Sequence, residues 1–182
     1  MELEEITGGE AAMRSSASKT GQGRQGADKK AQMSATAVGK LLSDPEGPRI
    51  GAIDLNGWDT HINGEPFDPR FISQLKRLDA VISSLQATLQ TVWDQTTICV
   101  MTEFGRTVRI NGSSGTDHGV ATAAFLIGGG INGGKVLTDW PGLGEKDLYE
   151  GRDLRPTSDI RGLFKGVLRE GFDMADRQLD EV

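Results

Sequence analysis

Apolar residues recur at alternating steps of four and three along one stretch of the chain, which is the spacing of one face of an α-helix. The stretch runs over residues 69–92, and its apolar positions are Phe71, Leu75, Leu78, Ile82, Leu85, Leu89 and Val92. Asp68 is the predicted N-cap, and Pro69 suits the first helical position because proline has no N–H to leave unpaired there. The pattern predicts an amphipathic helix of about six turns that packs against a sheet.

Short, mostly apolar runs before and after this helix predict buried strands. They cover residues 49–55, 96–102 and 121–127, with a further short strand around 135–137. The order strand, helix, strand is typical of a right-handed crossover between parallel strands. A last helix is predicted from Ser158, with Thr157 or Ser158 as its cap. The sequence therefore predicts an α/β fold with a mainly parallel central sheet flanked by helices.

The beginning of the chain differs in composition from the rest. Residues 7 to about 35 are rich in Gly, Ser, Ala, Lys and Gln and have almost no large apolar side chains. Such a segment cannot bury enough surface to offset the entropy lost on ordering. We therefore expect residues 1–34 to be disordered or only locally helical, with a short helix over 34–42, and residues 35–182 to form the folded domain.

Charge and hydropathy narrow the classes of partner. The formal net charge of −6 over 182 residues argues against nucleic acid or an anionic membrane as the default partner. No stretch approaches the roughly 20 apolar residues of a membrane span, and the acidic start at residues 1–5 is unlike a signal peptide. If the chain is complete, it is expected in the cytoplasm. Its one cysteine, Cys99, lies in an apolar run and is interpreted as a buried structural thiol.

The two histidines of the chain each stand beside an aspartate in a glycine-rich setting. Asp59 and His61 form the first pair, and Asp117 and His118 form the second. Carboxylate and neutral imidazole together are a donor set that suits Zn²⁺ or Mn²⁺. Both pairs follow predicted strands, and open α/β sheets bind their ligands at strand ends. The competing interpretation is that both histidines hydrogen-bond the loop backbone.

Spacing decides how each pair could bind a cation. In locally extended backbone, both side chains of the first pair point the same way and can hold one ion. The adjacent residues of the second pair splay apart, so they serve two neighbouring metals, or one binds while the other supports from behind. Glu103 adds a carboxylate at the end of the second predicted strand. A salt bridge with Arg106 or Arg109 is the equally weighted alternative for Glu103.

Two arginines follow the second predicted strand and provide a candidate site for anions. A guanidinium group binds phosphate or sulfate oxygens in a bidentate manner. We therefore predict that Arg106 steadies an anionic ester beside the metal. Structural pairing of Arg106 and Arg109 with acidic loop residues is the alternative.

Five motifs occur together in a fixed order. They are Gly57-Trp58-Asp59-Thr60-His61, Thr102-Glu103-Phe104-Gly105-Arg106-Thr107, Gly115-Thr116-Asp117-His118-Gly119, Asp139-Trp140-Pro141-Gly142-Leu143 and Gly151-Arg152-Asp153-Leu154-Arg155-Pro156-Thr157-Ser158-Asp159. Over about residues 35–172 the chain thus resembles the bacterial domain-of-unknown-function family 1501 (DUF1501), whose members are similar to the alkaline phosphatase and sulfatase superfamily. The resemblance implies an α/β sandwich with a metal centre at the carboxyl ends of its strands.

The resemblance also implies roles for single residues. Asp59 and His61 stand where the superfamily has an Asp and a His for one metal, and Glu103 follows a core strand like the carboxylate of a second metal. Phe104 occupies the place where a histidine often follows, so the implied centre holds one or two ions. Phosphate or sulfate ester hydrolysis is carried over from the superfamily by analogy alone.

Family members look about twice as long and often begin with a twin-arginine export signal, and the nucleophile of the superfamily lies in the half that this chain does not resemble. We therefore expect an incomplete C-terminal portion of a metal-dependent hydrolase for small phosphate or sulfate esters, weak or inactive in isolation. Its exposed sheet edge would favour oligomers. The alternative is a non-catalytic binding or accessory module with the same fold and a degenerate metal site.

Overall fold

The structure, a computed structural model, describes residues 26, 28–62, 64 and 68–181. The described chain divides into two compact units. The first comprises residues up to Asn56 together with Leu75–Thr88, and the second comprises Gly57–Gln74 and the residues from Leu89 onward. Within the described ranges, no helix is both long enough and apolar enough to cross a membrane.

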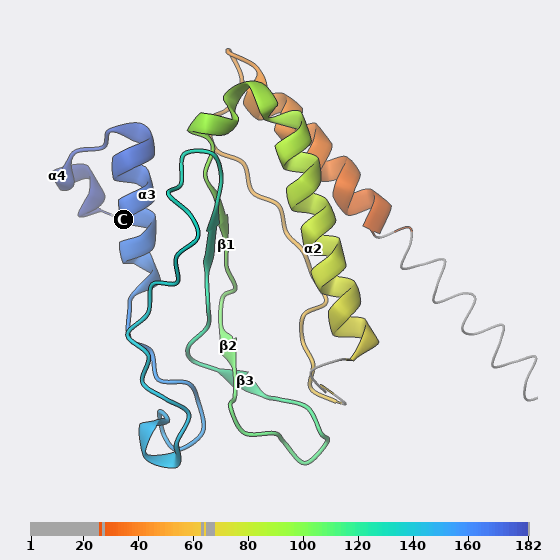
Figure 1. Cartoon of the computed structure of the whole chain (residues 1–182), viewed down its shortest axis with the longest axis vertical. Coiled ribbons are helices and arrows are strands. Elements are labelled where there is room, and N and C mark those ends of the chain that lie inside the picture. Colours follow the sequence, from red (N-terminus) through yellow and green to blue (C-terminus); the bar gives the residue numbers. More distant parts are fainter. Residues whose placement is uncertain (1–25, 27, 63, 65–67, 182) are drawn as a thin grey trace, which may run out of the picture. The chain divides into compact units, whose positions relative to one another are not determined.

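Two helices form the first unit (Figure 1). One spans residues 28–43, and the other is the part of α2 (Pro69–Thr88) that begins at Leu75. A glycine lets the two helices approach closely, because a Cβ at Gly39 would lie only 2.5 Å from Thr88 Oγ1. The buried apolar residues of this unit are Ala31, Ala35, Val81 and Leu85.

The first helix is longer than the sequence predicted. A short helix was expected over 34–42, whereas the structure has helix over 28–43. Residues 28–34 of the segment expected to be disordered or only locally helical therefore belong to a helix. Residues 1–25 and 27 of that segment lie outside the described residues.

Helix α2 begins as the sequence predicts. The Asp68 Oδ1 atom accepts a hydrogen bond from the Arg70 backbone N–H at 2.7 Å, which makes Asp68 the N-cap and Pro69 the first helical residue. The helix ends at Thr88, short of the predicted end, and the chain continues as the 3₁₀-helix η1 (Gln90–Gln95). The amphipathic helix is thus confirmed over Pro69–Thr88, and a separate 3₁₀-helix follows where its last turn was predicted.

Residues 49–55 do not form the predicted strand. They run without a ladder partner among the described residues, and Ile50 is 69% exposed. A side chain rather than a strand contacts the end of the run, because Arg77 Nη1 donates to the Asn56 carbonyl at 3.2 Å. A strand persists only where a neighbour satisfies its N–H and C=O groups. The predicted crossover unit is therefore not formed.

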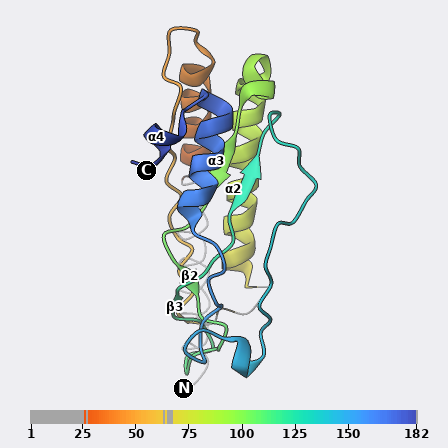
Figure 2. The same cartoon turned by 90° about the vertical axis from the view of Figure 1, so that its left-hand side faces the viewer.

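The second unit contains two small antiparallel sheets (Figure 2). Strand β1 (Ile98–Val100) pairs with β4 (Phe125–Ile127), and β2 (Gly105–Arg106) pairs with β3 (His118–Gly119). The prediction of a mainly parallel central sheet flanked by helices is therefore wrong. The reason is topological: the chain reverses through the β2–β3 ribbon between the two predicted strands, so they meet antiparallel.

Small sheets leave apolar residues exposed. Phe125 on β4 is 57% exposed, and Val136 and Leu137, where a short strand was predicted, are each 90% exposed. Each strand of a two-stranded sheet has one free edge, which is the feature that supports pairing with another chain. Oligomerisation through such an edge stays a prediction.

The C-terminal part of the second unit consists of short helices joined by loops. These are the 3₁₀-helix η2 (Glu145–Asp147), α3 (Ile160–Phe172) and α4 (Asp176–Leu179). The predicted last helix corresponds to α3. Its cap is Asp159 rather than Thr157 or Ser158, because Asp159 Oδ1 accepts from the Arg161 backbone N–H at 2.9 Å.

The cap of α3 gives a testable ionisation. The Arg161 guanidinium, and then the Arg161 backbone N–H, hold the pKa of Asp159 at about 2. Arg161→Ala removes the guanidinium and keeps the backbone donor, so the pKa of Asp159 should rise part of the way toward its ordinary 3.8. A lowered carboxyl pKa stabilises the fold above the ordinary pKa, and this contribution is lost as the pH falls toward 2. The variant should therefore show a weaker fall in stability over that range.

An NMR titration of the Asp159 carboxyl carbon measures this pKa directly. Arg177→Ala, which removes a guanidinium from α4, is the control and should leave the pKa of Asp159 unchanged. If Arg161→Ala also leaves it unchanged, the guanidinium is not its cause.

Candidate metal centre

Two segments that are far apart in the sequence run side by side in the second unit. The backbone N–H of Thr116 donates to the Thr60 carbonyl at 3.0 Å, and that of Gly64 donates to the Ser114 carbonyl at 2.8 Å. These two hydrogen bonds place the loop of the first Asp/His pair beside the loop of the second. Convergence of the two pairs is therefore built by the backbone.

Glycines make the close approach of these segments possible. Gly115 is buried, and a Cβ there would lie 2.3 Å from the carbonyl carbon of His61. A Cβ at Gly119 would lie 2.6 Å from the carbonyl carbon of Arg106. In the β2–β3 ribbon Arg106 is the register partner of His118. Two of the residues predicted to carry chemistry thus sit opposite each other on one ribbon.

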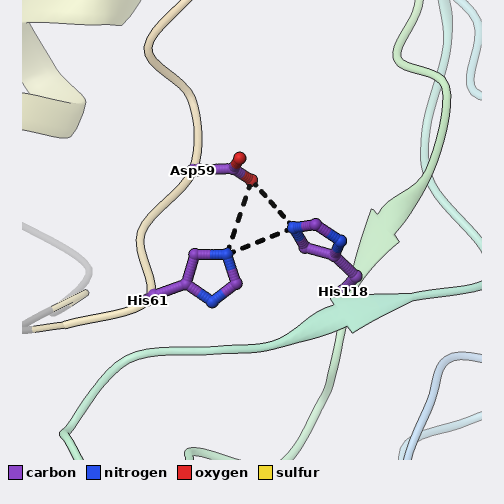
Figure 3. A group of neighbouring side chains, drawn as sticks. All are labelled: Asp59, His61 and His118. Atoms are coloured by element: carbon purple, nitrogen blue, oxygen red, sulfur yellow. Dashed lines mark hydrogen bonds and ion pairs between the residues drawn. The ribbon is translucent and has the colours of Figure 1, made fainter.

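Three donor atoms face one another, as Figure 3 shows. The Nε2 atoms of His61 and His118 are 3.1 Å apart. The Oδ1 atom of Asp59 lies 3.4 Å from the Nε2 of His118 and 4.0 Å from the Nε2 of His61. About half of each of these side chains is exposed. We refer to Asp59, His61 and His118 as the three-residue cluster.

The spacing of the three-residue cluster fits a single divalent cation. A circle drawn through three points with these separations has a radius of about 2.1 Å, and zinc keeps about 2.0–2.2 Å from imidazole nitrogen and carboxylate oxygen. Two imidazoles and one carboxylate are also a ligand set of catalytic zinc sites, which keep a further position for water or substrate. The donor set and its dimensions therefore suit Zn²⁺ or Mn²⁺.

The far edge of the His61 ring faces a carboxylate. Nδ1 of His61 lies 3.7 Å from Asp117 Oδ1, and Asn111 Nδ2 donates to that same oxygen at 3.0 Å. The hydrogen bond from Asn111, and secondly the neighbouring His61, lower the pKa of Asp117. An ionised carboxylate on this side favours the tautomer with the proton on Nδ1. The lone pair of Nε2 is then directed into the cluster.

The His118 ring is supported by an aromatic neighbour. Phe104 stacks on it with ring centroids 4.0 Å apart and planes inclined by 26°. Phe104 packs against a candidate ligand and contributes no donor atom to the three-residue cluster.

Arg106 connects the two loops of the centre. Its Nη1 donates to Asp59 Oδ1 at 2.7 Å, its Nε donates to Thr116 Oγ1 at 3.0 Å, and its Nη2 donates to the Thr116 carbonyl. The pairing of Arg106 with an acidic loop residue, one of the two alternatives drawn from the sequence, is therefore present. Two of the five N–H groups of a guanidinium stay unused by these three bonds. The role of Arg106 toward an anionic ester stays a prediction.

Comparison with known proteins identifies the family. The family model described as "Protein of unknown function (DUF1501)" matches residues 7–182, which include the whole three-residue cluster. The chain belongs to the DUF1501 family. The family resemblance drawn from the five motifs is thereby confirmed, and the match extends to residues before the first of them. Searches of curated proteins and of solved structures gave no match to this DUF1501 chain.

The remaining predicted residues of the DUF1501 chain take other places. Asp117 lies behind the His61 ring and is not a member of the three-residue cluster. Glu103 is exposed and also lies outside it. Arg109 pairs with Glu145, at 2.8 Å between Nη2 and Oε1, and Arg106 pairs with Asp59, so the alternative salt bridge of Glu103 with either arginine is not formed among the described residues.

Sequence reasoning missed Asn111 and Thr116, which bind the loops of the centre together through hydrogen bonds to the carbonyls of His61 and Thr60. The only available signal was the Asn-Gly dipeptide at residues 111–112, which is typical of a turn. A turn signal does not reveal which distant segment the turn will contact.

Proposed function

We propose that the three-residue cluster binds one divalent cation, Zn²⁺ or Mn²⁺, and that the chain is part of a metal-dependent hydrolase for small phosphate or sulfate esters. The observation that carries the proposal is the convergence of Asp59 Oδ1 with the Nε2 atoms of His61 and His118 at the spacing of one ion. The carboxylate of Asp117 behind His61 supports it, because metal-binding histidines usually have such an outer partner.

Each residue of the centre has a definite part in this function. A bound cation supplies Lewis acidity that offsets the charge building on the leaving oxygen of an ester. Arg106 holds the Asp59 carboxylate in place, and the two N–H groups that make no hydrogen bond to the described residues are suitable donors for ester oxygens. The chain carries a net charge of −6, so an anionic substrate needs the local positive potential of a cation and Arg106.

The link to the alkaline phosphatase and sulfatase superfamily rests on motifs. Asp59 and His61 occupy the positions of an Asp and a His ligand in that superfamily, and the ester chemistry is proposed from this correspondence. The small antiparallel sheets give it no support. The proposal therefore depends on the donor set of the cluster and can be tested without reference to the fold.

Metal content tests the proposed cation site first, and ester hydrolysis then tests the proposed activity. Protein dialysed against Zn²⁺ or Mn²⁺ and then against buffer should retain close to one ion per chain, measured by elemental analysis. Hydrolysis of p-nitrophenyl phosphate or p-nitrophenyl sulfate should be slow, stop on chelation and return with the metal. If the chain retains no ion, the three-residue cluster is not a cation site and the proposed function fails.

One observation favours a second function, a non-catalytic binding or accessory module that keeps the metal. The Arg106 side chain is largely engaged with Asp59 and Thr116, so the structure commits it to holding loops together. Stoichiometric metal without any metal-dependent ester hydrolysis, with both esters assayed, is the result expected of this function.

A further inference from the structure

We propose that Asn111 is the positioning residue of the candidate metal centre, because its side-chain amide fixes the loop of the second Asp/His pair against His61. As a statement about cation binding, this inference rests on the proposed function. As a statement about how the His61 ring is held, it stands on the hydrogen bonds alone.

All four hydrogen-bonding positions of the Asn111 amide are used. Nδ2 donates to the His61 carbonyl at 3.0 Å and to Asp117 Oδ1 at 3.0 Å. Oδ1 accepts from the backbone N–H of Ser113 at 2.9 Å and of Gly115 at 3.0 Å. An amide has two N–H donors and two lone pairs, so its capacity is filled. The partners also fix its orientation, since carbonyl and carboxylate oxygens accept and backbone N–H groups donate.

The backbone of Asn111 is equally engaged. Its N–H donates to the Gly115 carbonyl at 2.8 Å, and its carbonyl accepts from the Ser114 N–H at 3.2 Å. Main chain and side chain together therefore close the turn over residues 111–115. The amide oxygen holds this turn, whereas the amide nitrogen reaches out of the turn to the other loop.

The nitrogen end of the Asn111 amide therefore contacts the candidate metal centre. The amide nitrogen holds His61 from two sides, through its backbone carbonyl and through the Asp117 carboxylate that faces its Nδ1. Without that nitrogen, Asp117 loses its closest donor and the His61 ring can turn about its side-chain bonds. Loss of such an outer partner typically weakens metal binding by about 10- to 100-fold.

Asn111→Asp separates the two ends of the amide. The carboxylate keeps acceptors for the N–H groups of Ser113 and Gly115, so the turn can persist, but it offers oxygen instead of N–H to His61 and Asp117. A general effect of the added negative charge would strengthen cation binding, whereas loss of positioning weakens it. The sign of the change therefore distinguishes the two.

The experiment compares Zn²⁺ affinity, by competition with a chromophoric chelator, in the wild type, Asn111→Asp, Asn111→Ala and Asn132→Asp. Asn132 is exposed in a different loop and controls for the charge change. Both Asn111 variants should bind Zn²⁺ about 10- to 100-fold more weakly, and the control should match the wild type. Unchanged or tighter binding in both folded Asn111 variants would overturn the inference and leave the proposed function intact.

A second readout needs no metal. Long-range ¹H–¹⁵N NMR spectra report the tautomer of the His61 ring, which should be the Nδ1–H form in the wild type and a mixture in Asn111→Ala. A purely structural role would lower the melting temperature without changing this ratio. If the wild type binds no Zn²⁺ but the ratio changes, the proposed function fails and the positioning of His61 by Asn111 stands. An unchanged ratio in the folded variant overturns it.

Discussion

His118→Ala should lower the affinity of the chain for Zn²⁺ by about a hundredfold or more. Structural zinc sites gain about 10–16 kcal/mol from four ligands, so each contributes about 3 kcal/mol, and every 1.4 kcal/mol is a factor of ten. His118 supplies the atom with the shortest distances to both other donors, 3.1 Å and 3.4 Å. Its removal leaves two donors 4.0 Å apart, which hold an ion poorly. His61→Ala should act similarly.

The measurement is a competition titration with Zn²⁺, accompanied by elemental analysis and the two ester assays. Val120→Ala is the matched control, since Val120 is two positions from His118, is 52% exposed and offers no donor atom. Its affinity should equal that of the wild type. If both histidine variants retain the wild-type metal content, the three-residue cluster is not a metal centre and the histidines are loop scaffolding.

The helices could be predicted because their signals are local. Two adjacent residues, Asp68 and Pro69, indicate where α2 begins, and apolar residues recur at helical spacing over most of the helix. The cap of α3 was misplaced because Thr157, Ser158 and Asp159 are all good capping residues in succession. Choosing among them requires the geometry of the entering chain.

The sheet could not be predicted because the strands that pair lie far apart in the sequence. An apolar run such as residues 49–55 indicates a tendency to be buried and carries no information on which strand will pair with it. Residues 98–100 pair with residues 125–127, and the β2–β3 ribbon lies between them in the sequence. Because the chain reverses through this ribbon, the two strands are antiparallel. The error in the fold therefore came from assigning partners to strands, one of which has none in the described chain.

The site was predictable to the level of its residue types. Both Asp/His pairs are visible in the sequence, and their convergence was expected at the strand ends of a parallel sheet, which the described residues do not form. Loop pairing brings them together instead, through Thr60 with Thr116 and through the Asn111 amide. Such contacts involve backbone groups, which every residue possesses, so the type of a residue does not indicate where they form.

Gly115→Ala should destabilise the protein or separate the two loops of the centre. The effect should be larger than that of a methyl group added elsewhere in the loop of the second Asp/His pair. The new Cβ would lie 2.3 Å from both the carbonyl carbon and the oxygen of His61, and 2.6 Å from the Thr60 oxygen. These are backbone atoms held by the pairing of the two loops, so no side-chain rotation relieves the contact. Overpacking costs about 1–3 kcal/mol, and a hydrogen bond lost as the loops separate costs about 1 kcal/mol more. The free energy of unfolding should fall by about 2–4 kcal/mol.

Gly112→Ala is the matched control in the same turn, because a Cβ there meets nothing within 4 Å. Both substitutions reduce the entropy of the unfolded chain equally, so the difference between them isolates the steric contact. Urea unfolding should place Gly112→Ala within about 0.5 kcal/mol of the wild type. Equal stability of the two variants together with unchanged Zn²⁺ binding would contradict the close approach of the loops. If Gly115→Ala instead keeps its stability but loses Zn²⁺, the loops have separated locally, and their contact serves the metal centre rather than the fold.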